Sequence, residues 1–357
     1  MIKKILPAAL LAALSFNAMA ASNVTLYGVI DEAVTVTKHK GESAVVKLDN
    51  GIYAGSRFGL RGVEDLGNGN SVGFILEQGF NADDGSEAYG GKAFSREALL
   101  QVKGNWGEFA FGRAGGLSSD CGTYTILHGG ALWTSYYTDG NMASAFINTD
   151  RMDNLVIYKS PSFSGATITA MYSNGTGLNS TGEDDKKWSK NSHYYGIGLD
   201  YAHNDTVFSA MWEMLDNKDL DAKSTQLFTL GGQQGFGNWT VWAAYQYAHN
   251  SQMLPGWNYA EQGNKGVSQH AVTAAIGYKI AGGEWKLEGN YAHGKSNSTN
   301  EKYNIWSAGT AYEYPLSNRT LVYLYGGYGK ANKLLNTGSY RSTFNSWTLC
   351  SGISHSF

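Results

Sequence analysis

After its first twenty residues the chain is dominated by short stretches in which apolar residues recur at every second position. Val24, Leu26 and Ile30 share one parity near the start, and the same alternation returns in residues 71–77 and 239–247. Successive side chains of a β-strand point to opposite faces, so a period of two predicts strands rather than helices. The sequence therefore predicts an all-β protein.

Sixteen such stretches can be counted, separated by polar segments that are rich in the chain's 46 glycines. Tight separators such as 65–70 and 203–205 alternate with long ones such as 81–92 and 249–267. Short turns at one end and long loops at the other are typical of a transmembrane β-barrel. The expected strand starts are Asn23, Ile52, Ser71, Phe94, Glu108, Asp153, Ala166, Tyr194, Thr206, Gln226, Asn238, Ser268, Glu284, Tyr303, Thr320 and Thr343.

Residues 1–20 have the pattern of an export signal. Lys3 and Lys4 precede a short apolar run, and Ala18-Met19-Ala20 is a small-residue cleavage site. The remaining chain, 21–357, is expected to form one outer-membrane barrel domain. Loss of the two leader lysines changes the formal net charge from −3 to −5.

A secreted β-sandwich or soluble barrel would also alternate and carry a leader. An even strand count favours the membrane barrel, because a closed sheet leaves no unpaired backbone in lipid. Aromatic residues near strand ends also favour it, since they suggest girdles at the two membrane surfaces. The residues expected in these girdles are Tyr194, Tyr195, Trp239, Trp242, Tyr312, Tyr314, Tyr323 and Tyr325.

One connection, residues 114–152, is unusually long. A structureless segment of about forty residues is improbable unless it packs somewhere or has a function. It is aromatic and glycine-rich, and a sixteen-stranded barrel leaves an aqueous lumen into which it could fold. We expect it to fold inward and narrow that lumen; the alternative is an exposed surface loop.

Composition and spacing exclude several other classes of protein. The near-neutral charge lacks the basic stripe of a nucleic-acid binder, and two cysteines cannot form a disulfide framework. The eight histidines are scattered, with no nucleophile and base at a defensible spacing and no metal-ligand cluster. We therefore expect no enzyme activity, no cofactor and no metal.

Several ordered motifs resemble those of the general diffusion porins of Gram-negative outer membranes, especially the β-proteobacterial branch. The matching stretches are 24–28 (VTLYG), 56–67 (SRFGLRGVEDLG), 104–107 (GNWG), 154–158 (NLVIY), 160–165 (SPSFSG), 316–320 (LSNRT) and the closing 352–357 (GISHSF). The third loop lacks the acidic glycine-rich tract of enterobacterial relatives, and residues 194–278 match only in pattern.

The resemblance implies a homotrimer in the outer membrane, in contact with lipid and lipopolysaccharide. It also implies an inward-folded third loop and passive passage of ions and small hydrophilic solutes. The terminal Phe357 would belong to the signal for the barrel-assembly machinery. A substrate-specific channel, for example for sugars, is the alternative, because Tyr124, Trp133, Tyr136 and Tyr137 could form an aromatic ladder.

A positive wall is expected in the lumen. Arg57 and Arg61 share a face opposite Phe58, and a lipid-facing arginine would cost about 2–4 kcal/mol. The resemblance adds Arg113, and parity with Leu155 adds Arg151. Glu77 and Lys159 are further possible lumen charges, and the parity of Arg96 leaves it at the rim or at a subunit contact. The alternative for each arginine is a pair with a neighbouring carboxylate.

The inserted segment would supply the opposing wall through Asp120 and Asp139. Two acids against three or four arginines suggest a mild preference for anions. Cys121 lies in this segment and Cys350 has the inward parity of the last strand, so a disulfide between them is possible in an oxidising periplasm.

Overall fold

The structure, a computed structural model, describes residues 23–89, 91–119, 122–132, 140–178, 187–218, 221–255, 258–259, 265–332, 335 and 345–357. The expected export signal lies outside these residues. No helix in the described part of the chain is long and apolar enough to cross a membrane.

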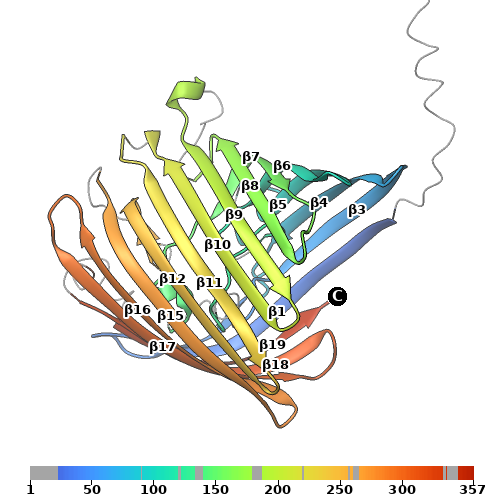
Figure 1. Cartoon of the computed structure of the whole chain (residues 1–357). Coiled ribbons are helices and arrows are strands. Elements are labelled where there is room, and N and C mark those ends of the chain that lie inside the picture. The colour runs from blue at the N-terminus through green and yellow to red at the C-terminus, as the bar shows by residue number, and fades with distance from the viewer. Residues whose placement is uncertain are drawn as a thin grey trace, which may run out of the picture.

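The chain forms a closed antiparallel β-barrel of sixteen strand positions (Figure 1). Each strand pairs with its neighbours in sequence, and the last strand pairs back with the first, Val29 to His39 against Ser346 to Ser356. One position is shared by two segments, β2 and β3, which pair with different parts of β1. The strands of the barrel are β1 (Asn23–His39), β2 (Val45–Asn50), β3 (Arg57–Gly67), β4 (Asn70–Gly79), β5 (Glu97–Gly104), β6 (Gly107–Gly115), β7 (Arg151–Lys159), β8 (Ala166–Asn174), β9 (His193–His203), β10 (Thr206–Asp216), β11 (Thr225–Phe236), β12 (Trp239–Ser251), β15 (Val267–Ile280), β16 (Gly283–Ser296), β17 (Lys302–Pro315), β18 (Thr320–Ala331) and β19 (Asn345–Ser356).

The predicted fold is confirmed, and most strands begin within three residues of the predicted position. The second position differs. The predicted start at Ile52 falls in residues 51–56, where the chain leaves the barrel wall between β2 and β3. There Ile52 is buried and the ring of Tyr53 stacks on Tyr323 of β18, at 5.5 Å between centroids.

Among the described residues, three shorter elements lie outside the wall. Two are single turns of 3-10 helix, η1 (Met142–Ser144) and η3 (Trp188–Lys190), and the third is the small hairpin of β13 (Met253–Leu254) and β14 (Asn258–Tyr259). Connections at one end of the barrel are short, such as the turn between β15 and β16, whereas those at the other end are long.

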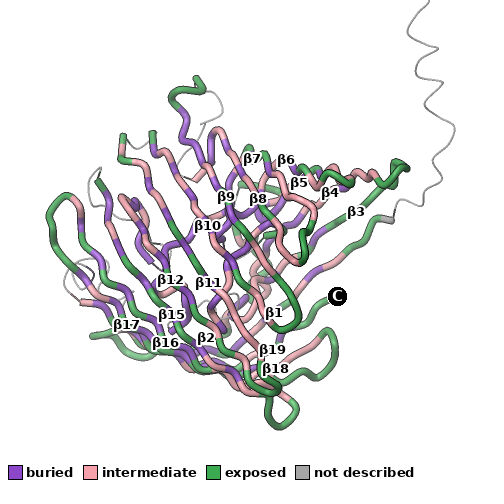
Figure 2. The backbone as a smooth tube through the Cα atoms, viewed as in Figure 1, coloured by how far each residue is buried: buried purple, intermediate pink, exposed green. Residues whose placement is uncertain are grey.

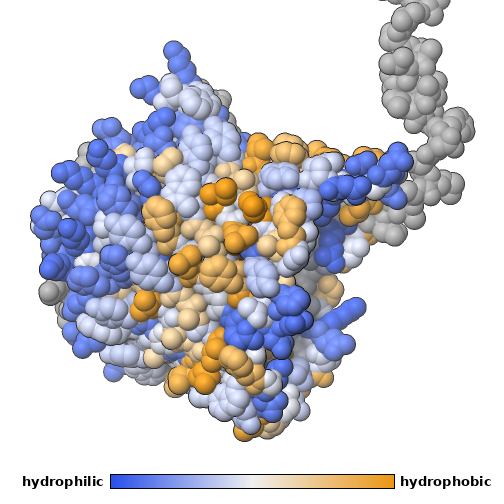
Figure 3. Space-filling model, in the orientation of Figure 1, coloured by the Kyte–Doolittle hydropathy of each residue, from blue (hydrophilic) through white to orange (hydrophobic). Residues whose placement is uncertain are grey.

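Each strand has one buried and one exposed face, which Figure 2 shows as alternating colours along β15 and β16. Exposed side chains of the outward face are largely apolar, for example Leu26, Leu100 and Leu349, each more than half exposed. On the face seen in Figure 3, apolar residues gather over the middle of the strands. A closed sheet with such a surface satisfies its backbone internally and meets lipid with its side chains.

The prediction of aromatic girdles was wrong for three residues. Tyr194, Tyr323 and Tyr325 are buried on the inward face, because they share parity with inward residues of their strands. Trp239 and Tyr314 are exposed on the outward face, as expected.

The C-terminus completes the closure of the barrel. Phe357 exchanges two backbone hydrogen bonds of 3.1 Å with Gly28 of β1. A Cβ atom at position 28 would lie 2.3 Å from Cζ of the Phe357 ring, so only glycine allows this ring position.

Candidate functional site

The segment between β6 and β7 lies inside the barrel, where inward side chains hold it. The backbone N–H of Ser118 donates to Glu213 of β10 (3.2 Å), and that of Leu132 donates to Glu288 of β16 (2.9 Å). Asn290, also on β16, donates to the carbonyl oxygen of Gly140 (3.2 Å). The alternative, an exposed surface loop, is thus excluded for the described part of this segment.

The return path of the segment is held in the same way. Gln246 of β12 accepts from the N–H of Ile147 (2.8 Å) and donates to its carbonyl oxygen (2.6 Å). Gln269 of β15 donates to the carbonyl oxygen of Ala145 (2.7 Å). These bonds place the segment along one side of the lumen, from β10 to β16. We call this side the docking wall.

Two residues tie the start of the segment to the near side. The side chain and N–H of Thr123 both donate to Glu97 of β5 at 2.8 Å. The hydroxyl of Tyr124 donates to Glu108 of β6 and accepts a bond from Gln101. Burial, together with the Glu108 carboxylate, raises the pKa of the Tyr124 phenol well above its ordinary value.

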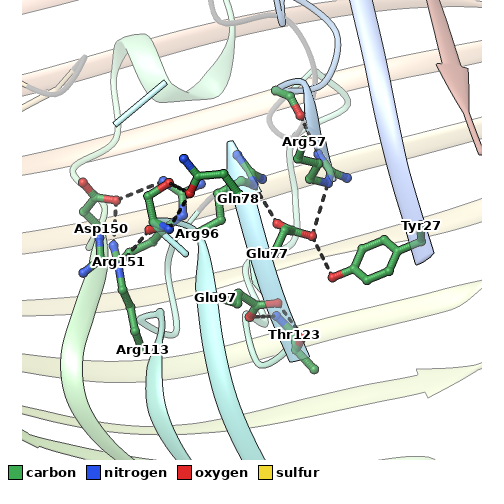
Figure 4. A network of polar contacts seen from close by, with 12 residues as sticks. Tyr27, Arg57, Glu77, Gln78, Arg96, Glu97, Arg113, Thr123, Asp150 and Arg151 are labelled. Carbon is green, nitrogen blue, oxygen red and sulfur yellow. Dashed lines mark hydrogen bonds and ion pairs between the residues drawn. The ribbon is translucent and has the colours of Figure 1, made fainter. Parts of the chain in front are cut away.

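The side of the lumen formed by β1, β3, β4 and β5 carries a cluster centred on Glu77, shown in Figure 4. Nε of Arg96 lies 2.6 Å from one carboxylate oxygen of Glu77, and Nε of Arg57 lies 3.5 Å from the other. The hydroxyl of Tyr27 donates to the same carboxylate (3.1 Å). Two guanidinium groups therefore share the carboxylate of Glu77, and Glu97 of β5 lies opposite Glu77 in the register. We call this side the passage wall.

Arg61 extends the passage wall toward the end with short turns. Its guanidinium carbon lies 5.1 Å from the centre of the Tyr27 ring, a cation–π distance. Tyr27 in turn covers Gly59, where a Cβ atom would lie 2.6 Å from the ring. Within the described part of the chain, Arg61 has no ion pair with a carboxylate.

Arg113 forms a separate group with an acid of β7. Its Nη1 lies 2.6 Å from Asp153, and its Nε donates to the carbonyl oxygen of Ser95 (2.8 Å). Lys92 contacts the other oxygen of Asp153 (2.7 Å). Arg113 thus pairs with a neighbouring carboxylate, which was the alternative predicted for each arginine.

Arg151 does not follow the parity from which its inward position was predicted. The pairing of β6 and β7 shifts between Gly112 and Ala114, and Asn154 adopts a φ of 57°. Beyond this bulge Met152 takes the inward, buried position opposite Ala114. Arg151 lies instead 5.0 Å from the centre of the Tyr89 ring and 3.7 Å from Asp150. An extra residue in a bulge moves the side chains beyond the bulge to the opposite face of the sheet from the one that strict alternation predicts.

Arg96 is a second residue that strand parity misplaced. It precedes β5 by one residue, so the alternation of that strand does not govern its side chain. It is only 5% exposed and takes part in the Glu77 cluster rather than lying at a rim. The signal in the sequence was its place at the base of a long loop, one residue before Glu97, which pairs with the inward residue Glu77.

The remaining predicted residues have mixed outcomes. Lys159 keeps the inward parity of Ile157 and lies opposite Glu108. Cys350 is buried beside the inward cluster that contains Leu132, and its thiol is free. Asp120, Asp139 and Cys121 lie outside the described residues, so the acids of the inserted segment stay predictions, whereas the free Cys350 forms no disulfide in this structure.

The aromatic ladder of a sugar channel gains no member from the described residues. Tyr124 is 2% exposed and its hydroxyl is occupied by Glu108 and Gln101. Trp133, Tyr136 and Tyr137 lie outside the described residues. The described residues also contain no group of three or more His, Cys, Asp or Glu side chains arranged to hold a metal ion.

Comparison with known proteins agrees with this architecture. The sequence model of a family described as Gram-negative porin matches residues 8–334. An outer membrane porin protein of Bordetella pertussis is 30% identical, over 92% of this chain and 94% of its own length. The major outer membrane protein P.IB of Neisseria gonorrhoeae is 27% identical, over 94% and 97%.

Solved structures show the same fold. An anion-selective porin from Comamonas acidovorans superimposes with a TM-score of 0.69 at 23% identity, covering 94% of this chain and all of that one. A trimer form of OmpT from Vibrio cholerae superimposes with a TM-score of 0.63 at 16% identity, over 94% and 100%.

Proposed function

The chain belongs to the Gram-negative porin family, and on that premise we propose a constricted, mildly anion-preferring pore for this outer-membrane channel. The membership makes it an integral outer-membrane protein through which small solutes diffuse. The proposal adds that residues 114–152 form the constriction, and that the passage wall sets the charge preference.

The observation that carries the proposal is the group of three guanidinium groups around one ion-paired carboxylate on the passage wall. The other buried acids of these strands, Asp31 and Glu97, accept hydrogen bonds from neighbouring groups instead. Arg57 and Arg96 share the single carboxylate of Glu77, and Arg61 lies on the same wall without an ion pair among the described residues. Arginine remains protonated in any protein site, so these guanidinium groups cannot neutralise one another. An anion that passes this wall is therefore attracted and a cation is repelled.

The acids of the docking wall do not cancel the field of these guanidinium groups at the passage. Glu213 accepts hydrogen bonds from Ser118, Thr149 and Tyr194, and it is 1% exposed. Glu288 accepts from the N–H of Leu132 and is also 1% exposed. Each carboxylate lies behind the inserted segment and faces its N–H and O–H groups, so its field at the passage is weakened.

The permeation mechanism needs no covalent step. Water and polar solutes orient in the field between the passage wall and the inserted segment, whereas an apolar solute must displace that ordered water. The structurally similar porin from Comamonas acidovorans is anion-selective, which supports this charge preference. The trimer form of the Vibrio cholerae relative supports a homotrimer.

Purified protein in a planar lipid bilayer under a KCl gradient tests the proposal. We expect a reversal potential that favours chloride, conductance steps in groups of three, and current that rises linearly with salt. A reversal potential that favours potassium would refute the anion preference. Current that saturates with a single solute would favour a substrate-specific channel instead.

A further inference from the structure

The backbone of the inserted segment lies directly against the barrel wall where inward residues of the wall are glycine or alanine. A Cβ atom on Gly231 of β11 would lie 1.9 Å from the carbonyl oxygen of His128. A Cβ atom on the next residue of the segment, Gly129, would lie 2.6 Å from the Cβ atom of Ala244 of β12. Gly231 and Ala244 pair across β11 and β12, so the two contacts are neighbours. We call these four residues the first seat.

The segment makes a second contact of the same kind at Gly140. A Cβ atom on Gly309 of β17 would lie 2.9 Å from the carbonyl oxygen of Gly140. A Cβ atom on Gly140 itself would lie 2.3 Å from the carbonyl oxygen of Ala308 and 2.9 Å from Cα of Gly327 of β18. Gly309 and Gly327 pair across β17 and β18, next to the docking wall. We call Gly140, Gly309 and Gly327 the second seat.

The wall glycines of the two seats interrupt an inward face that carries side chains elsewhere. Thr229 precedes Gly231 on the inward face of β11, and Ser307 precedes Gly309 on the inward face of β17; all four residues are buried. The inward surface of the wall is therefore lower at the seats by the depth of a side chain. The backbone of the inserted segment occupies that depth.

A side chain at either seat would displace the inserted segment rather than the strand. Since β11 pairs with both β10 and β12, an outward shift of Gly231 would break backbone bonds in two ladders. The segment is held there by a side chain, because Nε2 of His128 lies 2.8 Å from Asp200 of β9. Carbon and carbonyl oxygen approach to about 3.3 Å in close contacts, so a methyl group at Gly231 would displace the carbonyl group of His128 by about 1.4 Å. A methyl group at Gly309 would displace that of Gly140 by only about 0.4 Å.

From these contacts we infer that Gly231 and Gly309 are positioning residues that set the size limit of the pore. Because they carry no side chain, the backbone of the inserted segment lies on the wall and the rest of the lumen is left to solutes. A larger residue at either position pushes the segment toward the passage wall and narrows the gap between them. The inference rests on the proposed constriction. It assigns the size limit to the two seats and leaves the charge preference to the passage wall.

Single-channel conductance, together with the swelling of proteoliposomes in uncharged sugars of increasing size, tests the inference. We expect Gly231→Ala to lower the conductance and to shift the size limit to a smaller sugar. Gly309→Ala should have the same effects to a smaller extent, because its added carbon is less crowded. The control Gly289→Ala makes the same change on the outward face of β16, where a Cβ atom meets nothing within 4 Å, and should behave like the wild type.

A crystal structure of each seat variant locates the inserted segment independently of the current. In Gly231→Ala the carbonyl oxygen of His128 should move away from β11, while the pairing of β11 with β10 and β12 is retained. If Gly231→Ala does not assemble into a barrel, Gly309→Ala provides the same test at the carbonyl oxygen of Gly140.

The two measurements separate the inference from the proposal on which it rests. A segment that stays in place while β11 or β17 shifts outward would overturn the inference alone. A displaced segment with the conductance and size limit of the wild type would refute the proposed constriction itself, because the segment would then not border the path of the solutes.

Discussion

Replacing Glu77 by glutamine should strengthen the preference for anions. Glu77 is 7% exposed and is the one carboxylate that Arg57 and Arg96 share. Glutamine keeps the size of the side chain and an oxygen that can accept from Arg96, but it removes the negative charge. The passage wall then gains one net positive charge while its packing is retained.

The size of the effect follows from Coulomb's law. An ion that passes about 7 Å from the removed charge interacts with it by about 0.6 kcal/mol in water. Salt at about 0.1 M has a Debye length of about 10 Å, which halves this to about 0.3 kcal/mol. The anion loses a repulsion and the cation loses an attraction, so the ratio of permeabilities should rise about three-fold toward chloride.

The assay is the reversal potential of single trimers under a KCl gradient, for wild type, E77Q and E64Q. Glu64 lies on the same strand, β3, with the parity of the outward residues Phe58 and Leu60, so E64Q makes the same change of charge outside the lumen. E64Q should leave the reversal potential unchanged. An E77Q channel whose potential equals that of the wild type, or moves toward potassium, would show that the Glu77 cluster does not face the path of the ions.

Two further substitutions test the closure of the barrel and the docking of the inserted segment. Gly28→Leu should displace the ring of Phe357 and destabilise the barrel by about 1–3 kcal/mol, which lowers the temperature of unfolding measured on gels. The control Gly289→Leu places its side chain in open space on β16 and should leave that temperature unchanged. Equal unfolding temperatures for the two variants would contradict the role of Gly28. Gln246→Ala removes both bonds to Ile147 and weakens docking of the inserted segment by about 2 kcal/mol, so open-channel current noise should increase. The control Gln233→Ala removes a bond to Trp242 instead and should not increase the noise. Equal noise in the two variants would argue against docking through Gln246.

The strands could be predicted from the sequence because one physical demand acts on every residue of the wall. Each position must face either lipid or the lumen, so the alternation survives along the whole of β15, β16 and β17. Where the ladder is unbroken, as at Arg57 and Arg61, parity also gave the correct face.

Parity failed where the ladder is interrupted. Arg151 lies beyond the bulge at Asn154, and Arg96 precedes the first residue of β5. Ile52 lies in the break between β2 and β3. The positions of such residues depend on contacts between segments distant in sequence, for example Arg96 with Glu77, and the period of a strand contains no information about those contacts.

The net charge of the chain is a poor guide to the preference of the pore, and the two walls explain why. On the docking wall, Glu213 and Glu288 are buried acceptors for backbone N–H groups of the inserted segment. A charged acceptor there makes a stronger hydrogen bond than a neutral one, so these acids stabilise the inward position of the segment. On the passage wall the guanidinium groups outnumber the carboxylate they share. In the proposed mechanism a chain with more acids than bases thus offers an ion a cationic path, because its buried acids hold the inserted segment while Arg57 and Arg61 face the lumen.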